Sequence, residues 1–237
     1  MPTQLSLARH LAGLRSARVA FVRYVDLAGP DAPVPTCAGW TVRDLVAHQE
    51  RARRELAAVP ASDAAYWTRR ACHQATVRAV DAQAAVLGRE PVPAETGIAV
   101  DIALDGIDER LDDSTWGPLS SDEEAVLVVS PCDAPDWWLV EIGPGAARTT
   151  RRSGPRVLGD WELGGGAVEL YLMLWNRTRR TDVPATWTPE VARSPSPWSS
   201  DPSWSPGAPA DPRRRPDSGP PPPSAPVPPS PRRLRRR

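Results

Sequence analysis

Three histidines and three cysteines are the residues of this 237-residue chain best suited to metal or nucleophilic chemistry. His48 follows Asp44 by four positions in the segment TVRDLVAHQE, so the two side chains would share one face of a helix. A carboxylate and an imidazole on one face can bind a divalent metal, with His73 or Asp81 from a later segment completing the set. The other interpretation of His73, which we favour, is a capping residue or a hydrogen-bond partner between helices.

His48, Cys37 and Cys72 also have two interpretations each. His48 taken alone is either a metal ligand or a partly buried core histidine, and His10 is expected at the surface of the first predicted helix. Cys37 and Cys72 are either nucleophilic thiols activated by nearby arginines or small buried apolar residues, and we favour the second. Three cysteines cannot form a full disulfide framework, and none has the spacing of a structural zinc site, which favours a reducing cytoplasm.

Four helices are predicted to position these residues. Apolar residues at intervals of three and four indicate the first, and Thr41 begins the second as an N-cap with Asp44 facing the positive helix end. A Val-Pro pair separates the second from the third, and Gly88 ends the third. The predicted helices span residues 5–27, 42–58, 62–87 and 97–111. Because their connections are short, they predict an up-down four-helix bundle over residues 1–116.

The pattern changes after this bundle. Short runs rich in β-branched and aromatic residues predict strands at 125–130, 136–142 and 147–153, followed by an apolar helix over 167–177. Residues 117–190 are therefore predicted to form a small α/β domain. Residues 191–237 consist mainly of Pro, Ser and Arg, a composition that buries too little apolar surface to fold, so we expect a disordered tail. The fold class predicted for the whole chain is α+β.

Several segments resemble the mycothiol-dependent maleylpyruvate isomerase family. The segment CAGWTVRDLVAHQE is similar to the turn and helix that carry a metal-binding histidine in that family, which is His48 here. The similarity continues through RRACHQATVRAVDAQ, LDGIDERL and GGGAVELYLMLWNR, and extends over roughly residues 5–180. The resemblance implies a metal-binding bundle of the DinB type followed by a small α/β domain.

The resemblance also implies a chemistry. A divalent metal, with zinc favoured, would bind in the bundle, and mycothiol would supply a thiolate for isomerisation or thiol transfer on a small electrophilic acid. Arg177 resembles the family's terminal arginine, which implies a role in holding a carboxylate. The alternative for Arg177 is a cation that stabilises a helix C-terminus.

This chain departs from the family pattern at two of the three implied ligand positions. Those positions are occupied by Gln74 and Arg78, of which the first is a poor zinc ligand and the second a permanent cation. Only 24 residues lie between His48 and His73, a shorter connection than the family pattern has. An alternative function is therefore a non-catalytic relative that uses the scaffold to bind a small molecule or a protein.

Charge and hydropathy limit the classes of binding partner that we expect. Residues 1–192 contain 20 Arg against 26 Asp and Glu, and residues 193–237 contain 9 Arg against 3 Asp, so only the tail is basic. Nucleic acid is expected to bind at most weakly, through that tail, although docking of the tail to a partner remains a third hypothesis. No signal segment or membrane span is expected, which favours a cytoplasmic protein whose partners are a small thiol and a small organic acid.

Overall fold

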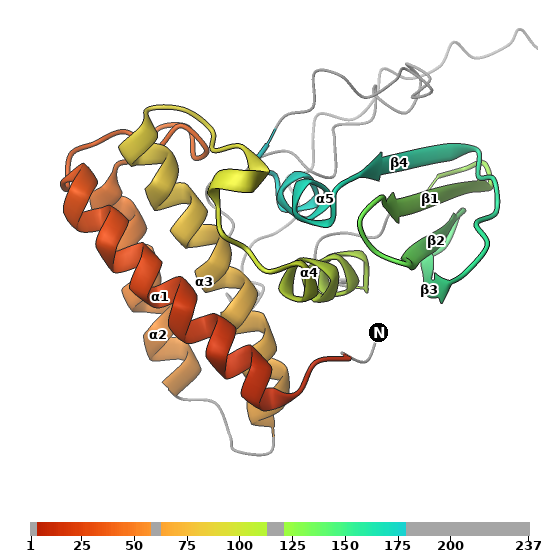
Figure 1. Ribbon diagram of the computed structural model, residues 1–237, viewed down its shortest axis with the longest axis horizontal. Helices are drawn as coiled ribbons and strands as arrows, with labels where there is room; N and C mark the ends of the chain where they lie inside the picture. Colours follow the sequence, from red (N-terminus) through yellow and green to blue (C-terminus); the bar gives the residue numbers. More distant parts are fainter. Residues whose placement is uncertain (1–3, 58–62, 113–120, 179–237) are drawn as a thin grey trace, which may run out of the picture. The chain divides into compact units, whose positions relative to one another are not determined.

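The computed structural model describes residues 4–57, 63–112 and 121–178 (Figure 1). It confirms the α+β class, with helices first and a four-stranded sheet after them. The chain divides into two compact units, Met1–Ser203 and Trp204–Arg237, and the second lies outside the described residues. The predicted tail at 191–237 also lies outside them, and with it the hypothesis of tail docking.

Three helices lie side by side and match the predicted segments to within a few residues (Figure 1). The first, α1, has Ser6 as its N-cap, whose hydroxyl accepts from the amide of Arg9 at 3.2 Å. The third ends at Gly88, whose φ of 67° is left-handed, a conformation that glycine adopts without steric cost. These helices are α1 (Leu7–Ala28), α2 (Val42–Ala57) and α3 (Ala64–Leu87).

A short 3₁₀ helix, η2 (Pro93–Glu95), leads into α4 (Val100–Asp112), which packs against α3 and against the last helix, α5 (Ala167–Leu174). The predicted extension of α5 to Arg177 is wrong. The helix ends at Leu174 because Asn176 adopts a left-handed conformation, with φ 58°.

The sheet has the strand order β3-β2-β1-β4. The three predicted strands are confirmed as β1 (Ala125–Pro131), β2 (Asp136–Ile142) and β3 (Arg148–Ser153), which pair antiparallel in sequence order. A fourth, β4 (Trp161–Gly165), pairs parallel to β1, with Leu127 opposite Trp161. Its Gly-rich sequence lacks the β-branched run that indicates a strand, so the pattern did not predict it.

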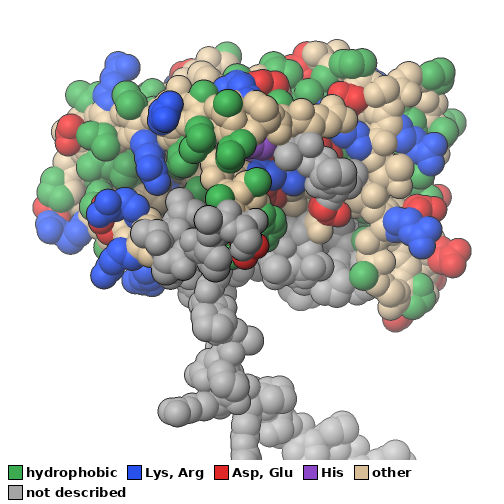
Figure 2. Space-filling view, turned by 90° about the horizontal axis from the view of Figure 1, so that it is seen from below, with side chains coloured by type: hydrophobic (Ala, Val, Ile, Leu, Met, Phe, Trp, Pro, Cys, Tyr) green, Lys and Arg blue, Asp and Glu red, His purple; other side chains and the backbone are tan. Residues whose placement is uncertain are grey.

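The largest hydrophobic core lies where α3, α4 and α5 meet the sheet. It joins Val80 and Ile107 from the helices to Val129 and Trp138 from the strands, so it contains residues from both sides of the predicted boundary at 116/117. One smaller core lies between α1, α2 and α3, and another lies between α1, α3 and α4. Among the described residues, no helix is both long and apolar enough to span a membrane. Figure 2 shows positive, negative and hydrophobic side chains interspersed over one face.

Candidate functional site

The carboxylate of Asp81 on α3 lies at the centre of a buried charged group that we call the Asp81 cluster: Thr36, His48, Arg78, Asp81 and Arg177. Asp81 is fully buried. Its Oδ1 accepts from Thr36 Oγ1 at 2.6 Å and lies 2.6 Å from Arg177 Nε, while its Oδ2 accepts from Arg78 Nη1 at 2.8 Å. Side chains from the α1–α2 loop, from α3 and from the end of α5 therefore meet at one carboxylate.

The conformation of the loop between α1 and α2 places Thr36 next to Asp81. The amide of Val34 donates to the carbonyl of Trp40 at 2.9 Å, and the amide of Trp40 donates to the carbonyl of Cys37 at 3.0 Å. Gly39 closes the turn with φ 79°, in the region that favours glycine. These local bonds hold Thr36 and Cys37 in a fixed turn against α3.

His48 on α2 faces the guanidinium of Arg78. Arg78 occupies one of the ligand positions that the family resemblance implies, so a place beside His48 is expected. His48 Nε2 lies 3.3 Å from Arg78 Nη2, and the Arg78 guanidinium carbon lies 5.4 Å from the centre of the Trp40 ring. Burial, followed by the positive charges of Arg78 and Arg51, lowers the pKa of His48 to about 4. At neutral pH the imidazole is therefore uncharged, and its Nε2 can accept a hydrogen bond from Arg78.

Arg177 is placed by the motif that ends α5. The amide of Arg177 donates to the carbonyl of Leu172 at 2.7 Å, and that of Asn176 donates to Met173 at 2.9 Å. This pair of bonds, with left-handed Asn176 between, is a Schellman C-cap. It reverses the chain after α5, and the Arg177 guanidinium then reaches Asp81 on α3.

Among the residues that the structure describes, the Asp81 cluster carries one more positive charge than negative. Burial raises the pKa of Asp81, but Arg177 and Arg78 outweigh it, so the pKa is lowered and the carboxyl stays ionised. Burial also raises the pKa of the neighbouring Cys37 thiol to about 11, which leaves that thiol neutral. Two guanidiniums against one carboxylate suit an anion, because guanidinium donors match carboxylates and stabilise thiolates. His48 is only partly buried, so the cluster extends to the surface.

A comparison with protein families assigns the chain to a family. Residues 11–139, more than half of the chain, match the family described as mycothiol maleylpyruvate isomerase N-terminal domain. The chain belongs to this family. The match runs from within α1 to within β2 and includes His48, Gln74, Arg78 and Asp81. No match was found among curated proteins or among solved structures.

The resemblance of the sequence motifs implies a divalent metal at His48, and the residues around His48 do not fit one. The Arg78 guanidinium lies 3.3 Å from the ring nitrogen that would ligate, and Arg177 adds a second cation at the same carboxylate. A dication there would be repelled by both at short range. Gln74, one turn before Arg78, is half-buried and neutral. We therefore assign no metal-dependent step to this position.

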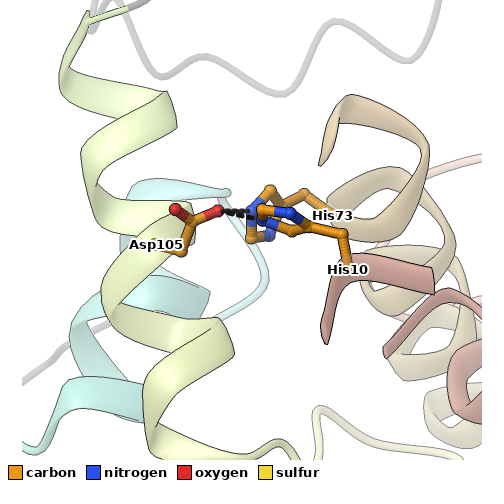
Figure 3. Close-up of side chains that lie close together, drawn as sticks. All are labelled: His10, His73 and Asp105. Atoms are coloured by element: carbon orange, nitrogen blue, oxygen red, sulfur yellow. Dashed lines mark hydrogen bonds and ion pairs between the residues drawn. The ribbon is translucent and has the colours of Figure 1, made fainter. Parts of the chain in front are cut away.

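A second cluster joins His10 of α1, His73 of α3 and Asp105 of α4 (Figure 3). Asp105 Oδ2 lies 2.8 Å from His10 Nε2 and 2.9 Å from His73 Nε2. His73 is thus the interhelical hydrogen-bond partner that we favoured. The expected surface position of His10 is wrong, because only 2% of this residue is exposed.

The sequence carried a signal for this second cluster. His10 lies on the same face of its helix as Leu14, Ala17 and Phe21, the residues that α1 buries. A histidine on an apolar face needs a buried partner, since burying a polar group without a hydrogen bond is costly. The sequence could not show that this partner was Asp105.

The other candidate residues have separate roles. Asp44 is exposed and accepts from the amide and the hydroxyl of Thr41 at 2.8 and 2.7 Å, so it caps α2 and does not join His48. Cys37 and Cys72 are buried, and burial raises the pKa of Cys72 to about 12. Both therefore behave as small buried residues, the interpretation that we favoured.

Proposed function

We propose that this family member binds a small anionic ligand at the Asp81 cluster, without a metal at His48. The candidate ligands are a small thiol of the mycothiol type, bound as its thiolate, and a small organic acid. The observation that carries this proposal is the excess positive charge of Arg78 and Arg177 over Asp81 in a buried position. The ligand would supply the missing negative charge.

The contacts of the two arginines support a shared role. Arg78 contacts Asp81 through Nη1 and His48 through Nη2, and Arg177 contacts Asp81 through Nε and donates from Nη1 to the carbonyl of Trp175 at 2.9 Å. These partners hold both guanidinium planes. A guanidinium oriented in advance loses little rotamer entropy when it binds a carboxylate.

A second candidate function is catalytic, and family membership favours it. Mycothiol would supply a thiol nucleophile for isomerisation or thiol transfer on a small electrophilic acid. Arg177 and Arg78 would then hold a carboxylate of the acid and lower the pKa of the thiol. Neither role uses a metal at His48.

Calorimetric titration of the full chain with mycothiol and with maleate, a simple diacid, tests the binding proposal. We expect at least one of the two to bind, and Arg177→Met to weaken binding by about tenfold or more. Arg43→Met is the matched control, since Arg43 forms an exposed pair with Asp31. The proposal fails if the folded chain binds neither compound, or if both variants bind alike.

An assay of mycothiol-dependent isomerisation of maleylpyruvate separates the two candidate functions. Turnover that is lost in Arg177→Met favours the enzyme. Binding of mycothiol or maleate with no turnover at saturating concentrations favours the non-catalytic binding protein.

A further inference from the structure

The cluster of His10, His73 and Asp105 brings together side chains from three helices at one buried point (Figure 3). The exposed fractions of the three residues are 2%, 0% and 2%. One ligand atom from each lies within 4.8 Å of the other two. The cluster shares no residue with the Asp81 cluster, so it requires its own explanation.

The oxygen at its centre has more nitrogen neighbours than hydrogen bonding can satisfy. Asp105 Oδ2 lies 2.8 Å from His10 Nε2, 2.9 Å from His73 Nε2 and 3.0 Å from Arg69 Nε. A carboxylate oxygen offers about two lone-pair positions. Three donors on one oxygen exceed that number, whereas a cation shared with the two imidazole lone pairs would leave Oδ2 with two partners, the cation and Arg69 Nε.

Glu109 shares Arg69 with Asp105, although its carboxylate is not among the ligand atoms that lie within 4.8 Å of one another. It follows Asp105 by four positions on α4, so both carboxylates lie on one face of the helix. Among the described residues its buried Oε1 has no hydrogen-bond partner, although Arg70 Nη1 lies 3.9 Å away and Arg69 Nε lies 3.3 Å from Oε2. Two imidazoles with one or two carboxylates form a typical donor set for zinc and for iron(II).

A hollow of about 190 Å³ lies near the cluster, but none of its lining residues is His10, His73 or Asp105. Its lining includes Gly13, Thr76 and Ile102, each one helical turn away from one of the three residues. The buried cluster is therefore about one helical turn away from the hollow on each of the three helices.

The geometry points to a divalent transition-metal site formed by His10, His73 and Asp105. Zinc and iron(II) suit imidazole and carboxylate ligands together, whereas magnesium and calcium prefer sites made of oxygen alone. The ion would join α1, α3 and α4. This site is separate from His48, Gln74 and Arg78, the positions that the family resemblance implies. Arg69 and Arg70 face two carboxylates here, those of Asp105 and Glu109, whereas Arg78 and Arg177 face the single carboxylate of Asp81.

The number of histidines makes this site testable without disturbing the core. The chain has three histidines, so His10 and His73 are the two that remain in His48→Gln. The full-length wild type and this variant are stripped of metal, refolded with zinc at pH 7.5 and dialysed, and zinc is then measured by elemental analysis. X-ray absorption of the bound zinc counts its imidazole ligands. We expect about one zinc for each chain in both proteins, with two imidazoles in the variant.

Substitutions of the proposed metal ligands provide a second test of the site. His10→Gln and Asp105→Asn, confirmed as folded by circular dichroism, should bind zinc at least about 100-fold more weakly. The site is refuted if the folded wild type holds no zinc, if His48→Gln abolishes binding, or if folded His10→Gln binds as tightly as wild type. If the substitutions in the core prevent folding, the imidazole count in His48→Gln decides: fewer than two refutes the site.

Discussion

Nε of Arg177, just beyond α5, lies 2.6 Å from Oδ1 of Asp81 in the middle of α3. This contact ties the end of the last described helix to the α1–α3 part of the fold. Arg78 contacts the other oxygen of the same carboxylate, so the carboxylate neutralises only one of two buried cations.

Asp81→Asn should lower the free energy of unfolding by about 3–5 kcal/mol, because it removes the carboxylate that Arg78 and Arg177 both contact, and their side chains are only 11% and 12% accessible. Urea denaturation followed by circular dichroism measures the change. The exposed pair of Asp31 and Arg43, with side chains 83% and 67% accessible, provides the control. Asp31→Asn should change stability by less than about 1 kcal/mol. Equal losses in the two variants would contradict a special role for the buried carboxylate.

Asn176→Ala should destabilise the protein by about 1 kcal/mol, since alanine is disfavoured at φ 58°. Asn176→Gly, which tolerates that conformation, should retain full stability. If the Schellman turn positions Arg177, the alanine variant should also bind the anionic ligand several-fold more weakly than the glycine variant. Thermal unfolding and calorimetric titration of both variants check this, and identical behaviour would exclude the positioning role.

Gly106→Ala should destabilise the protein by about 1–3 kcal/mol, although alanine is the better helix former by about 1 kcal/mol. A Cβ at Gly106 would lie 2.2 Å from Cε2 of Tyr171 and 2.9 Å from Nδ1 of His73. The clash therefore outweighs the gain in helix propensity. Gly145→Ala is the control, because no described atom lies within 4 Å of a Cβ at that position, and it should be close to neutral in urea denaturation. A stabilised Gly106→Ala would show that α4 and α5 pack less closely.

The folded protein should lose stability as the pH falls from about 6.5 to about 4, because the pKa of His48 is lower in the folded protein than in the unfolded chain. Its pKa is about 4 in the fold against 6.5 ordinarily, so in this range the unfolded chain takes up a proton that the folded chain does not. Above pH 7 the group contributes no pH dependence. Urea denaturation at pH 7 and pH 4.5 should show a drop on the order of 1–2 kcal/mol larger in wild type than in His48→Gln, after allowance for partial exposure. Parallel pH profiles would refute the lowered pKa.

NMR titration provides a direct check of the same pKa. Arg78→Leu should raise the pKa of His48 only part of the way to its ordinary value, because burial is the larger cause and Arg78 the second. A pKa of His48 near 6.5 in the wild type would contradict the placement beside Arg78.

Much of the fold followed from local patterns. The helix bounds could be predicted because apolar spacing, caps and breakers act within a few residues, as at Ser6 and Gly88. The strand β4 and the early end of α5 were missed. Pairing with β1 forms β4, and the left-handed turn at Asn176 depends on packing as well as on sequence.

The family membership was readable from the sequence, and so were the candidate positions His48, Arg78 and Arg177, because motifs place residue types at fixed spacing. The sequence did not predict which residues these side chains contact. Contacts such as Arg177 with Asp81, or His10 with Asp105, join residues from distant parts of the chain. Only the packing of α1, α3, α4 and α5 around shared cores sets those distances, since helix periodicity tells which face is buried and not what lies opposite.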